Sequence, residues 1–213
     1  MALIKRSFCL LFLLLPVSVF ADDAAALARL KAFTADLGTL RAEFTQTVLD
    51  DELETVRESS GTFLLRRPGK FRWNYEAPFE QIIVGDGANL WTYDPDLEQA
   101  TVKPMAETLA SSPASLLTGT RPIEEEFIVR ELGPAGELYW IELMPRVRDT
   151  DFERVRVALN DGRLDTMELQ DNLGQTTRIH FRDIEINVDI DDKAFRFTPP
   201  EGADVIGEAT PLE

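Results

Sequence analysis

The chain has 213 residues, enough for one domain with an ordinary hydrophobic core, and it contains one cysteine and one histidine. A single cysteine excludes a disulfide framework. Acidic side chains number 38 against 22 basic ones, and the formal net charge is -16. Because nucleic acids and anionic lipid surfaces bind clustered lysine and arginine, this charge argues against both as ligands.

The N-terminal residues have the features of a secretory signal peptide. Two basic residues precede an apolar run over residues 8–20, which is about 13 residues long and shorter than the roughly 20 that a membrane span needs. Small residues stand at the end of this run, and we predict cleavage after Ala21. Residues 1–21, with Cys9, are therefore expected to be removed from an exported, soluble chain of one domain over residues 22–213.

A helical repeat follows the predicted signal. Large apolar residues recur every three or four positions, with alanine between them, and this spacing predicts one amphipathic helix over residues 22–40. The residues that carry the repeat are Leu27, Leu30, Phe33, Leu37 and Leu40.

From residue 61 onward, apolar and polar residues alternate, as in strands with one wet face. Turn signals such as the Asn-Asp-Gly sequence at 160–162 separate these segments. We predict an antiparallel meander of about ten strands in a mainly β fold with some α-helix. The expected strands lie within 61–75 and at 81–84, 90–93, 98–103, 126–131, 138–144, 152–159, 164–169 and 176–181.

Two segments depart from the alternating pattern. Between residues 106 and 118 it stops, and Pro113, Leu116 and Leu117 predict short helices that end at Gly119. The polar end of the chain over 200–213 is expected to be a loosely held tail.

The side chains that most enzymes and metal sites need are scarce. A nucleophilic triad requires a base, and the one imidazole, His180, alternates with apolar neighbours and is expected to face water. Neither zinc ligands nor a phosphate-binding glycine-rich loop can be assembled from this sequence. Acidic runs at 124–126 and 189–192 are interpreted as solvated surface, with calcium an alternative for the second. We expect a binding protein, not an enzyme, with no cofactor, metal or nucleotide.

One segment, 61–75, carries more information. Its apolar residues at odd positions share a face if strand pairing is unbroken, and Arg67 falls on that same face. A guanidinium there must be buried and answered by acceptors, or else Arg67 lies at a strand end beside Pro68 and turns to solvent. Parity alone leaves both open. The apolar members of the face are Phe63, Leu65, Phe71 and Trp73.

The chain resembles the LolA family, the periplasmic carriers of outer-membrane lipoproteins. The central block is Gly-Thr-Phe-Leu-Leu-Arg-Arg-Pro-Gly-Lys-Phe-Arg-Trp at 61–73, and further blocks follow it in order through nearly all of the chain after residue 21. These further blocks are Gln-Ile-Ile-Val-Gly-Asp-Gly at 81–87, Leu-Trp-Thr-Tyr-Asp-Pro at 90–95, Leu-Glu-Gln-Ala-Thr-Val at 97–102, Ser-Pro at 112–113 and Phe-Arg-Phe-Thr-Pro-Pro-Glu-Gly at 195–202.

The resemblance implies a fold: an incomplete, strongly curved antiparallel β-barrel of about 10–11 strands, with helices covering the apolar concave face as a lid. It implies that Arg67 bonds to the lid and holds the empty cavity closed, and that Phe71 lies near the mouth. Gly85 stands where many relatives have serine, a change that we expect at a turn and without consequence. Implied cavity residues are Phe63, Leu65, Phe71 and Trp73, and implied lid residues are Leu27, Leu30, Pro113, Leu116 and Leu117.

The same resemblance implies a function and partners. The chain would be a monomeric periplasmic chaperone that takes acylated lipoproteins from an inner-membrane lipoprotein-releasing ABC transporter and delivers them to an outer-membrane receptor lipoprotein. Nucleic acid and nucleotide are not expected as ligands. The alternative is a periplasmic carrier or sensor of another lipid or amphiphile with the same fold, and an enzyme acting on acyl chains is the third reading.

Overall fold

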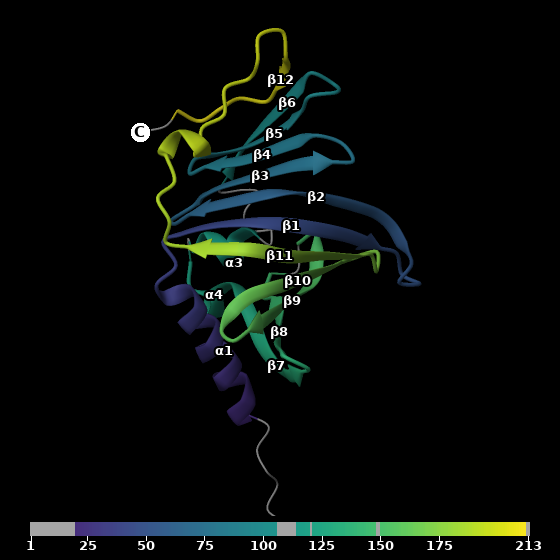
Figure 1. The fold of residues 1–213 in the computed structure, drawn as a ribbon, viewed down its shortest axis with the longest axis vertical. Coiled ribbons are helices and arrows are strands. Elements are labelled where there is room, and N and C mark those ends of the chain that lie inside the picture. Colours follow the sequence, from purple (N-terminus) through teal and green to yellow (C-terminus); the bar gives the residue numbers. More distant parts are fainter. Residues whose placement is uncertain (1–19, 106–113, 120, 148–149, 212–213) are drawn as a thin grey trace, which may run out of the picture.

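The structure is a computed structural model that describes residues 20–105, 114–119, 121–147 and 150–211. Most of these residues belong to one sheet of twelve strands (Figure 1). The helices are α1 (Phe20–Ala35), α3 (Ala114–Thr118), α4 (Ile123–Glu126) and the 3-10 helix η1 (Asp192–Phe195). The strands are β1 (Thr39–Leu49), β2 (Thr55–Arg66), β3 (Lys70–Ala77), β4 (Gln81–Asp86), β5 (Asn89–Asp94), β6 (Gln99–Pro104), β7 (Phe127–Ala135), β8 (Leu138–Pro145), β9 (Phe152–Asn160), β10 (Arg163–Asp171), β11 (Thr176–Ile186) and β12 (Asp204–Ile206).

The strands follow the order β12-β6-β5-β4-β3-β2-β1-β11-β10-β9-β8-β7, so the sheet is open and its edges are β12 and β7. Neighbours are antiparallel, except that β12 runs parallel to β6. The fold is therefore mainly β with short helices, as predicted. The predicted count of 10–11 strands was too low, because both β1 and β12 were missed.

Strand β1 begins at Thr39, inside the range 22–40 for which the helical repeat predicts a helix. The helix ends at Ala35, and the backbone N–H of Gly38 donates to Asn187 Oδ1 at 2.8 Å, where the chain turns into the sheet. Beyond it, Leu40, Ala42 and Phe44 are buried and alternate with exposed residues. The prediction of a helix to residue 40 was wrong because Leu37 and Leu40 satisfy the helical spacing while Leu40 also begins a repeat of two.

One apolar core lies on the inner face of the sheet. Phe44 and Phe63 from β1 and β2 belong to the same buried cluster as Ile141 and Val155 from β8 and β9, although these pairs lie on opposite sides of β11 and β10 in the sheet. Strands this far apart can share one core only because the sheet bends around it. Helices α1 and α3 pack against the same face, through residues such as Leu30, Leu116 and Leu117 (Figure 1).

The C-terminal segment crosses the outer face. Phe197 packs against Trp91, with ring centroids 5.5 Å apart, in a second apolar cluster on the side of the sheet away from the main core. Strand β12 extends the sheet, and Thr210 exchanges hydrogen bonds with the buried side chain of Asn89 at 2.7 and 2.9 Å. The prediction of a loosely held tail over 200–213 was therefore wrong for residues 200–211. The prediction failed because β12 is short and its side chains are exposed, so the polar composition of this segment gives no strand signal.

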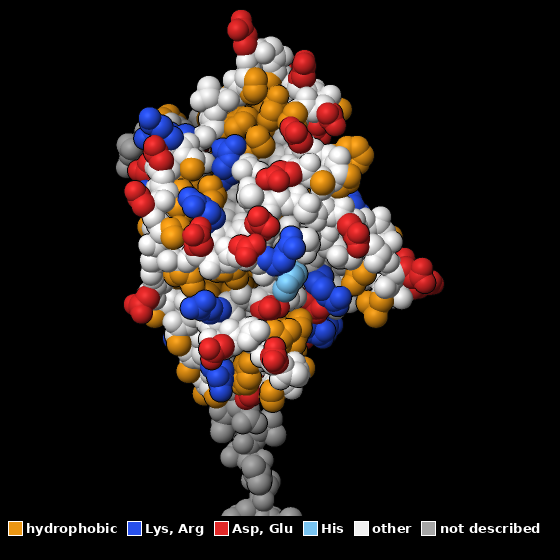
Figure 2. All heavy atoms as spheres, in the orientation of Figure 1, with side chains coloured by type: hydrophobic (Ala, Val, Ile, Leu, Met, Phe, Trp, Pro, Cys, Tyr) orange, Lys and Arg blue, Asp and Glu red, His pale blue; other side chains and the backbone are white. Residues whose placement is uncertain are grey.

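The outer face of β8 to β11 is polar and ion-paired. Glu142, which is almost buried, contacts Arg154 and Arg156, and Glu168 contacts Arg156 and Arg178. His180 lies on this face with 46% of its side chain exposed, as alternation predicted (Figure 2, pale blue). This face is solvated, and the main apolar core lies on the other one.

Candidate functional site

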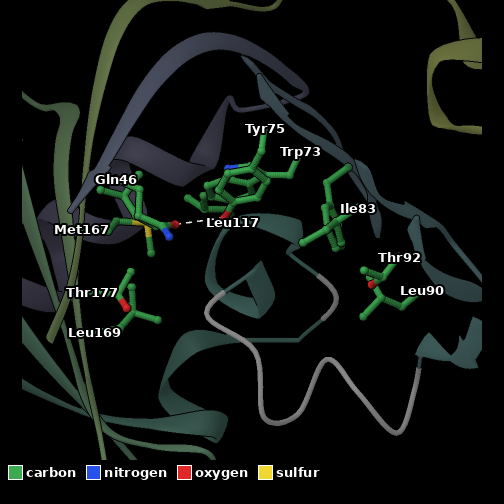
Figure 3. A pocket seen from close by; sticks show the side chains of 12 residues that line it. Gln46, Trp73, Tyr75, Ile83, Leu90, Thr92, Leu117, Met167, Leu169 and Thr177 are labelled. Atoms are coloured by element: carbon green, nitrogen blue, oxygen red, sulfur yellow. Dashed lines mark hydrogen bonds between the residues drawn. The ribbon is translucent and has the colours of Figure 1, made fainter. Parts of the chain in front are cut away.

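A cavity of about 270 Å³ lies on the inner face of the sheet (Figure 3). Its walls come from strands on both sides of the bend, and α3 contributes one residue to it. Because the strands alternate, every second residue of β3, β10 and β11 points into it. The residues that line it are Gln46, Phe71, Trp73, Tyr75, Ile83, Leu90, Thr92, Leu117, Met167, Leu169, Thr177 and Ile179.

Trp73 forms the aromatic centre of the wall. Its ring lies 4.3 Å from that of Phe63 and 5.3 Å from that of Phe44, between centroids, and the second pair is edge-on. Phe181 from β11 approaches the same ring at 6.3 Å. Contacts of this geometry make the wall rigid as well as apolar.

The four apolar residues predicted for the cavity share one face, since Phe63 pairs with Trp73 and Leu65 pairs with Phe71 across β2 and β3. They do not all reach the cavity. Phe71 and Trp73 line it, whereas Phe63 and Leu65 are fully buried in the core behind. Phe71 itself is only 3% exposed, so its ring is covered.

Sequence reasoning missed one polar feature of the cavity. The hydroxyl of Tyr75 donates to Gln46 Oε1 at 2.9 Å (Figure 3). Burial raises the pKa of Tyr75 to about 12, partly opposed by the charge of Arg57. The signal was available, because Tyr75 has the same parity as Trp73; Gln46 could not be found because β1 itself was missed.

Arg67 lies just past the end of β2, and its side chain turns toward the helices. Its Nε donates to the Leu117 carbonyl at 2.7 Å, its Nη1 to the Thr34 carbonyl at 3.0 Å and its Nη2 to the Leu116 carbonyl at 3.4 Å. Burial lowers the pKa of the Arg67 guanidinium from its ordinary value. Of the two alternatives left open by parity, the partly buried guanidinium answered by acceptors is right and the turn to solvent is wrong, although Arg67 does lie just past the end of a strand.

The last turns of α1 and α3 are thus joined through one guanidinium. A side chain at Gly119 would be strained and would displace the guanidinium, because a Cβ there would lie 2.7 Å from Arg67 Cζ and the residue has φ +64. The backbone N–H of Gly69 also donates to the Thr118 carbonyl at 3.1 Å. Free carbonyls at a helix end are good acceptors, so the C-terminal ends of both helices suit a cation.

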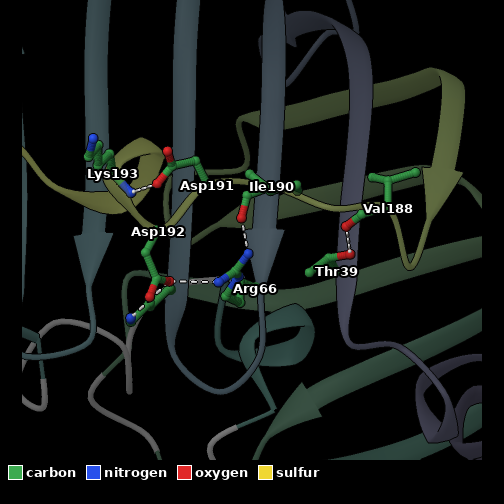
Figure 4. Close-up of polar contacts among 8 residues, drawn as sticks. Thr39, Arg66, Val188, Ile190, Asp191, Asp192 and Lys193 are labelled. Atoms are coloured by element: carbon green, nitrogen blue, oxygen red, sulfur yellow. Dashed lines mark hydrogen bonds and ion pairs between the residues drawn. The ribbon is translucent and has the colours of Figure 1, made fainter.

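Arg66, the neighbour of Arg67, points to the opposite face (Figure 4). Its Nη1 contacts Asp192 Oδ1 at 2.7 Å and its Nη2 donates to the Ile190 carbonyl. Asp191 caps η1 by accepting from the backbone N–H of Lys193 at 2.9 Å. The acidic run at 189–192 therefore helps to fix the C-terminal segment on the sheet. Among the described residues, no group of three or more His, Cys, Asp or Glu side chains could hold a metal ion.

The predicted lid residues differ in how deeply they are buried. Leu30, Leu116 and Leu117 are buried in the main core, and Leu117 reaches the cavity. Leu27 is only partly buried. Pro113 lies outside the described residues, as do residues 1–19 of the predicted signal peptide.

Gly85 also differs from its prediction. It lies inside β4, directly opposite Phe71 in the β3–β4 pairing, and not at a turn. The Gly85 position is buried, and the space that a side chain would occupy is filled by the Phe71 ring. Glycine at this position is therefore part of how the cavity wall is packed.

An open sheet bent around an apolar cavity, with helices packed over its inner face, is the architecture of a protein that binds an apolar ligand. The family model described as "Outer membrane lipoprotein carrier protein LolA" matches residues 35–198, and this chain belongs to that family. It is therefore a periplasmic, non-enzymatic transport protein of outer-membrane biogenesis. None of the described helices is both long and apolar enough to cross a membrane.

Two named relatives support the assignment over nearly the whole chain. The chain is 44% identical to the outer-membrane lipoprotein carrier protein of Nitrosospira multiformis over 96% of its own length and 99% of the relative's. It is 42% identical to that of Dechloromonas aromatica, over 92% and 93%. A solved structure of an uncharacterized conserved protein from Thermus thermophilus shares the fold, with a TM-score of 0.54 at 13% identity, over 86% of this chain and 97% of that one.

Proposed function

We propose that this chain accepts acylated lipoproteins from an inner-membrane, ATP-driven release complex, shields their acyl chains in the cavity behind Trp73, and delivers them to an outer-membrane receptor lipoprotein. The observation that carries the proposal is the apolar cavity on the inner face of the sheet, in a chain of the lipoprotein carrier family. We further propose that residues 1–21 are cleaved and that residues 22–213 act as one carrier domain, as a monomer.

The energetic need for such a cavity is large. Each buried methylene contributes about 0.8 kcal/mol, so one acyl chain of about 16 carbons exposed to water is penalised by on the order of 10 kcal/mol. A surface of aromatic and aliphatic side chains offsets that penalty. Since the chain must also give its cargo up, the empty state needs favourable contacts of its own.

The size of the cavity supports a closed, empty state. At about 270 Å³ it lies at or below the roughly 300 Å³ lower bound of pockets that hold drug-sized ligands. Several acyl chains require more room, and the open sheet can supply it if a helix moves off the inner face. We propose that the sheet and helices work as an incomplete barrel with a lid, and that Arg67 is the latch.

Among the described residues, the contacts of α3 that would have to separate on opening include hydrogen bonds and apolar packing. This five-residue helix is tied to the sheet by the hydrogen bonds of Arg67 and Gly69 and by its two leucines. Helix α1 has further ties to the β7–β8 side: Asp23 accepts from the Glu131 backbone N–H at 2.9 Å, and the Arg29 guanidinium lies 4.3 Å from the Tyr139 ring centre. We propose that α3 moves and that α1 stays with the sheet.

The test is release of a radiolabelled triacylated lipoprotein from spheroplasts on addition of the purified chain, scored as a soluble complex. Two neighbouring threonines on β11 offer a matched pair. Thr177→Trp fills the cavity and should abolish complex formation, whereas Thr176→Trp, on the opposite face, should leave it unchanged. Equal release by both variants would place the cargo elsewhere, and no release by a folded wild-type chain would favour another lipid ligand.

A further inference from the structure

Exposed apolar side chains gather at one end of the sheet. Of the large hydrophobic residues on the described surface, those more than 60% exposed all lie in the connections at a single end, where β1 and β2, β3 and β4, β5 and β6, β8 and β9, and β10 and β11 are joined. Turns at the opposite end carry glycine, proline and polar residues. The exposed residues are Leu53 (70%), Phe79 (71%), Leu97 (69%), Val147 (65%) and Leu173 (88%).

We name Leu53, Phe79, Leu97 and Leu173, with the turns that bear them, the tip surface. The connections follow one another in strand order along the right-hand end of the sheet in Figure 1. Neighbouring tips also touch: Asn172 Nδ2 donates to the Thr150 carbonyl at 2.8 Å, and Gly174 lies close to the Asp51 side chain. Single exposed leucines are ordinary on a protein surface, but the placement at one end of every large apolar residue that is more than 60% exposed among the described residues is not.

Aspartate side chains bond to the backbone in three of the turns that bear these apolar residues. Asp50 Oδ1 accepts from the backbone N–H of Glu52 at 3.0 Å and of Glu54 at 2.8 Å, around Leu53. The same device recurs at the β10–β11 turn, where Asp171 Oδ1 accepts from the N–H of Leu173 at 2.8 Å and of Gln175 at 2.9 Å. At the β5–β6 turn, Asp94 Oδ1 accepts from Leu97 N–H at 3.1 Å. A turn whose backbone is ordered in this way loses little backbone entropy when it binds.

Three of the four turns of the tip surface are also acidic, and their exposed carboxylates form no ion pair among the described residues. The turn segments 50–54, 78–80 and 95–98 contain acidic residues and no basic ones. On the outer face, by contrast, Glu142 and Glu168 are ion-paired with arginines. In Figure 2, acidic side chains stand beside hydrophobic ones at the right-hand extremity. Exposed carboxylates of the tip region that form no ion pair among the described residues are Asp51, Glu52, Glu54, Glu76, Glu80, Asp96 and Glu98.

We propose that the tip surface docks a membrane-anchored protein partner of the carrier, one whose docking face has apolar recesses edged by lysine or arginine. Apolar anchors supply the binding energy of such an interface, and unpaired carboxylates steer the encounter with a basic surface. A bare anionic lipid surface does not fit, because it would be repelled by the same carboxylates. The proposal rests on the proposed carrier function and adds to it a docking site at a distance from Arg67.

Two sets of variants test the two halves of the proposal. Leu53→Ser, Phe79→Ser and Leu173→Ser together remove the anchors without disturbing the core, since all three side chains are exposed. Asp51→Lys with Glu52→Lys reverses the charge while Asp50 still holds the turn. The matched control is Glu137→Lys with Glu201→Lys, both exposed and outside the tip surface.

Three measurements separate the outcomes. Uptake of the triacylated lipoprotein from detergent micelles reports the cavity alone and should be equal in all chains. Release from spheroplasts should fall about tenfold or more with the serine variant. It should fall about tenfold with the lysine variant at low ionic strength, with the difference fading at high salt. Co-sedimentation with vesicles of phosphatidylethanolamine and phosphatidylglycerol should be absent in the wild-type chain.

Unchanged release by both tip variants would overturn the proposal. Faster release with the lysine variant would also overturn it, because that result would indicate binding to an anionic lipid surface. If the wild-type chain takes up no lipoprotein even from micelles, the carrier function fails instead. Docking is then judged by photo-crosslinking on spheroplasts, with p-benzoylphenylalanine at position 173 and, as control, at 137. A protein adduct at 173 alone supports the tip surface; adducts with lipid, or none, refute it.

Discussion

Gly85 and Phe71 face each other across β4 and β3, and the ring of Phe71 occupies the space over the glycine backbone. A Cβ on Gly85 would lie 2.7 Å from Phe71 Cδ1 and closer still to Cε1, a distance at which one of the two must move. Because Phe71 is buried and lines the cavity, its position is set by the absence of a side chain on the neighbouring strand.

We predict that Gly85→Ser destabilises this chain by about 1 to 3 kcal/mol through overpacking. The measurement is the urea midpoint of unfolding. Pairing the change with Phe71→Leu should recover much of the loss, so that a double-mutant cycle shows strong coupling. Additive effects of the two substitutions would mean that the ring is free to turn away.

Arg67→Leu should separate lipid binding from lipid release. The change leaves the carbonyls of Thr34, Leu116 and Leu117 without their donor, and hydrogen bonds to a charged group are worth about 1.5 to 3 kcal/mol each. A weakened empty state makes giving up cargo less favourable, so the variant should form a soluble complex with lipoprotein and pass it poorly to outer-membrane vesicles.

Two controls accompany this prediction. Arg67→Lys keeps the charge, but one ammonium cannot match a fork that reaches three carbonyls, so transfer should be intermediate. Arg66→Leu, one residue away on the opposite face, should not impair transfer in this way. Normal transfer by the Arg67→Leu variant would show that Arg67 does not act as the latch.

Ionisation of Tyr75 should weaken the fold at high pH. Its pKa is about 12 in the folded chain, chiefly because of burial, against about 10 for an unperturbed tyrosine. Above about pH 10 the unfolded chain has released this proton and the folded chain has not, so stability falls as pH rises from about 10 to about 12. The loss from this one group is about 2 to 3 kcal/mol when the titration is complete.

The measurement is the free energy of unfolding as a function of pH, compared between the wild-type chain and Tyr75→Phe. The variant loses the donor to Gln46, so it should be less stable at neutral pH and should decline less steeply above about pH 10. Identical slopes in the two chains would show that Tyr75 titrates normally.

The C-terminal segment should depend on its aromatic anchor more than on its ion pairs. Phe195 is 1% exposed, and truncating a buried phenylalanine to alanine costs about 3 to 5 kcal/mol. Asp192, whose pKa is lowered mainly by Lys70, lies at the surface, and Asp192→Asn should have a much smaller, salt-dependent effect. Thermal unfolding of both variants at low and high salt is the test; a larger effect from Asp192→Asn would reverse this ranking.

The sequence by itself determined the class of protein and much of the inner face. Alternation along 61–75 placed Phe63, Leu65, Phe71 and Trp73 together because side chains of a strand alternate between two faces, whatever the rest of the fold does. The motif blocks at 61–73 and beyond gave the family. Scarcity of histidine and cysteine pointed away from catalysis.

Tertiary structure alone decided the rest. Leu40 fits a helix and a strand equally well by spacing, and only pairing of β1 with β2 and β11 resolves it. Arg67 could turn to solvent or inward, and the choice depends on carbonyls at 34, 116 and 117, far away in the sequence. Gly85 seemed harmless because its neighbour across the sheet was unknown. Local patterns fix which face a residue takes, whereas non-local packing fixes what that face meets.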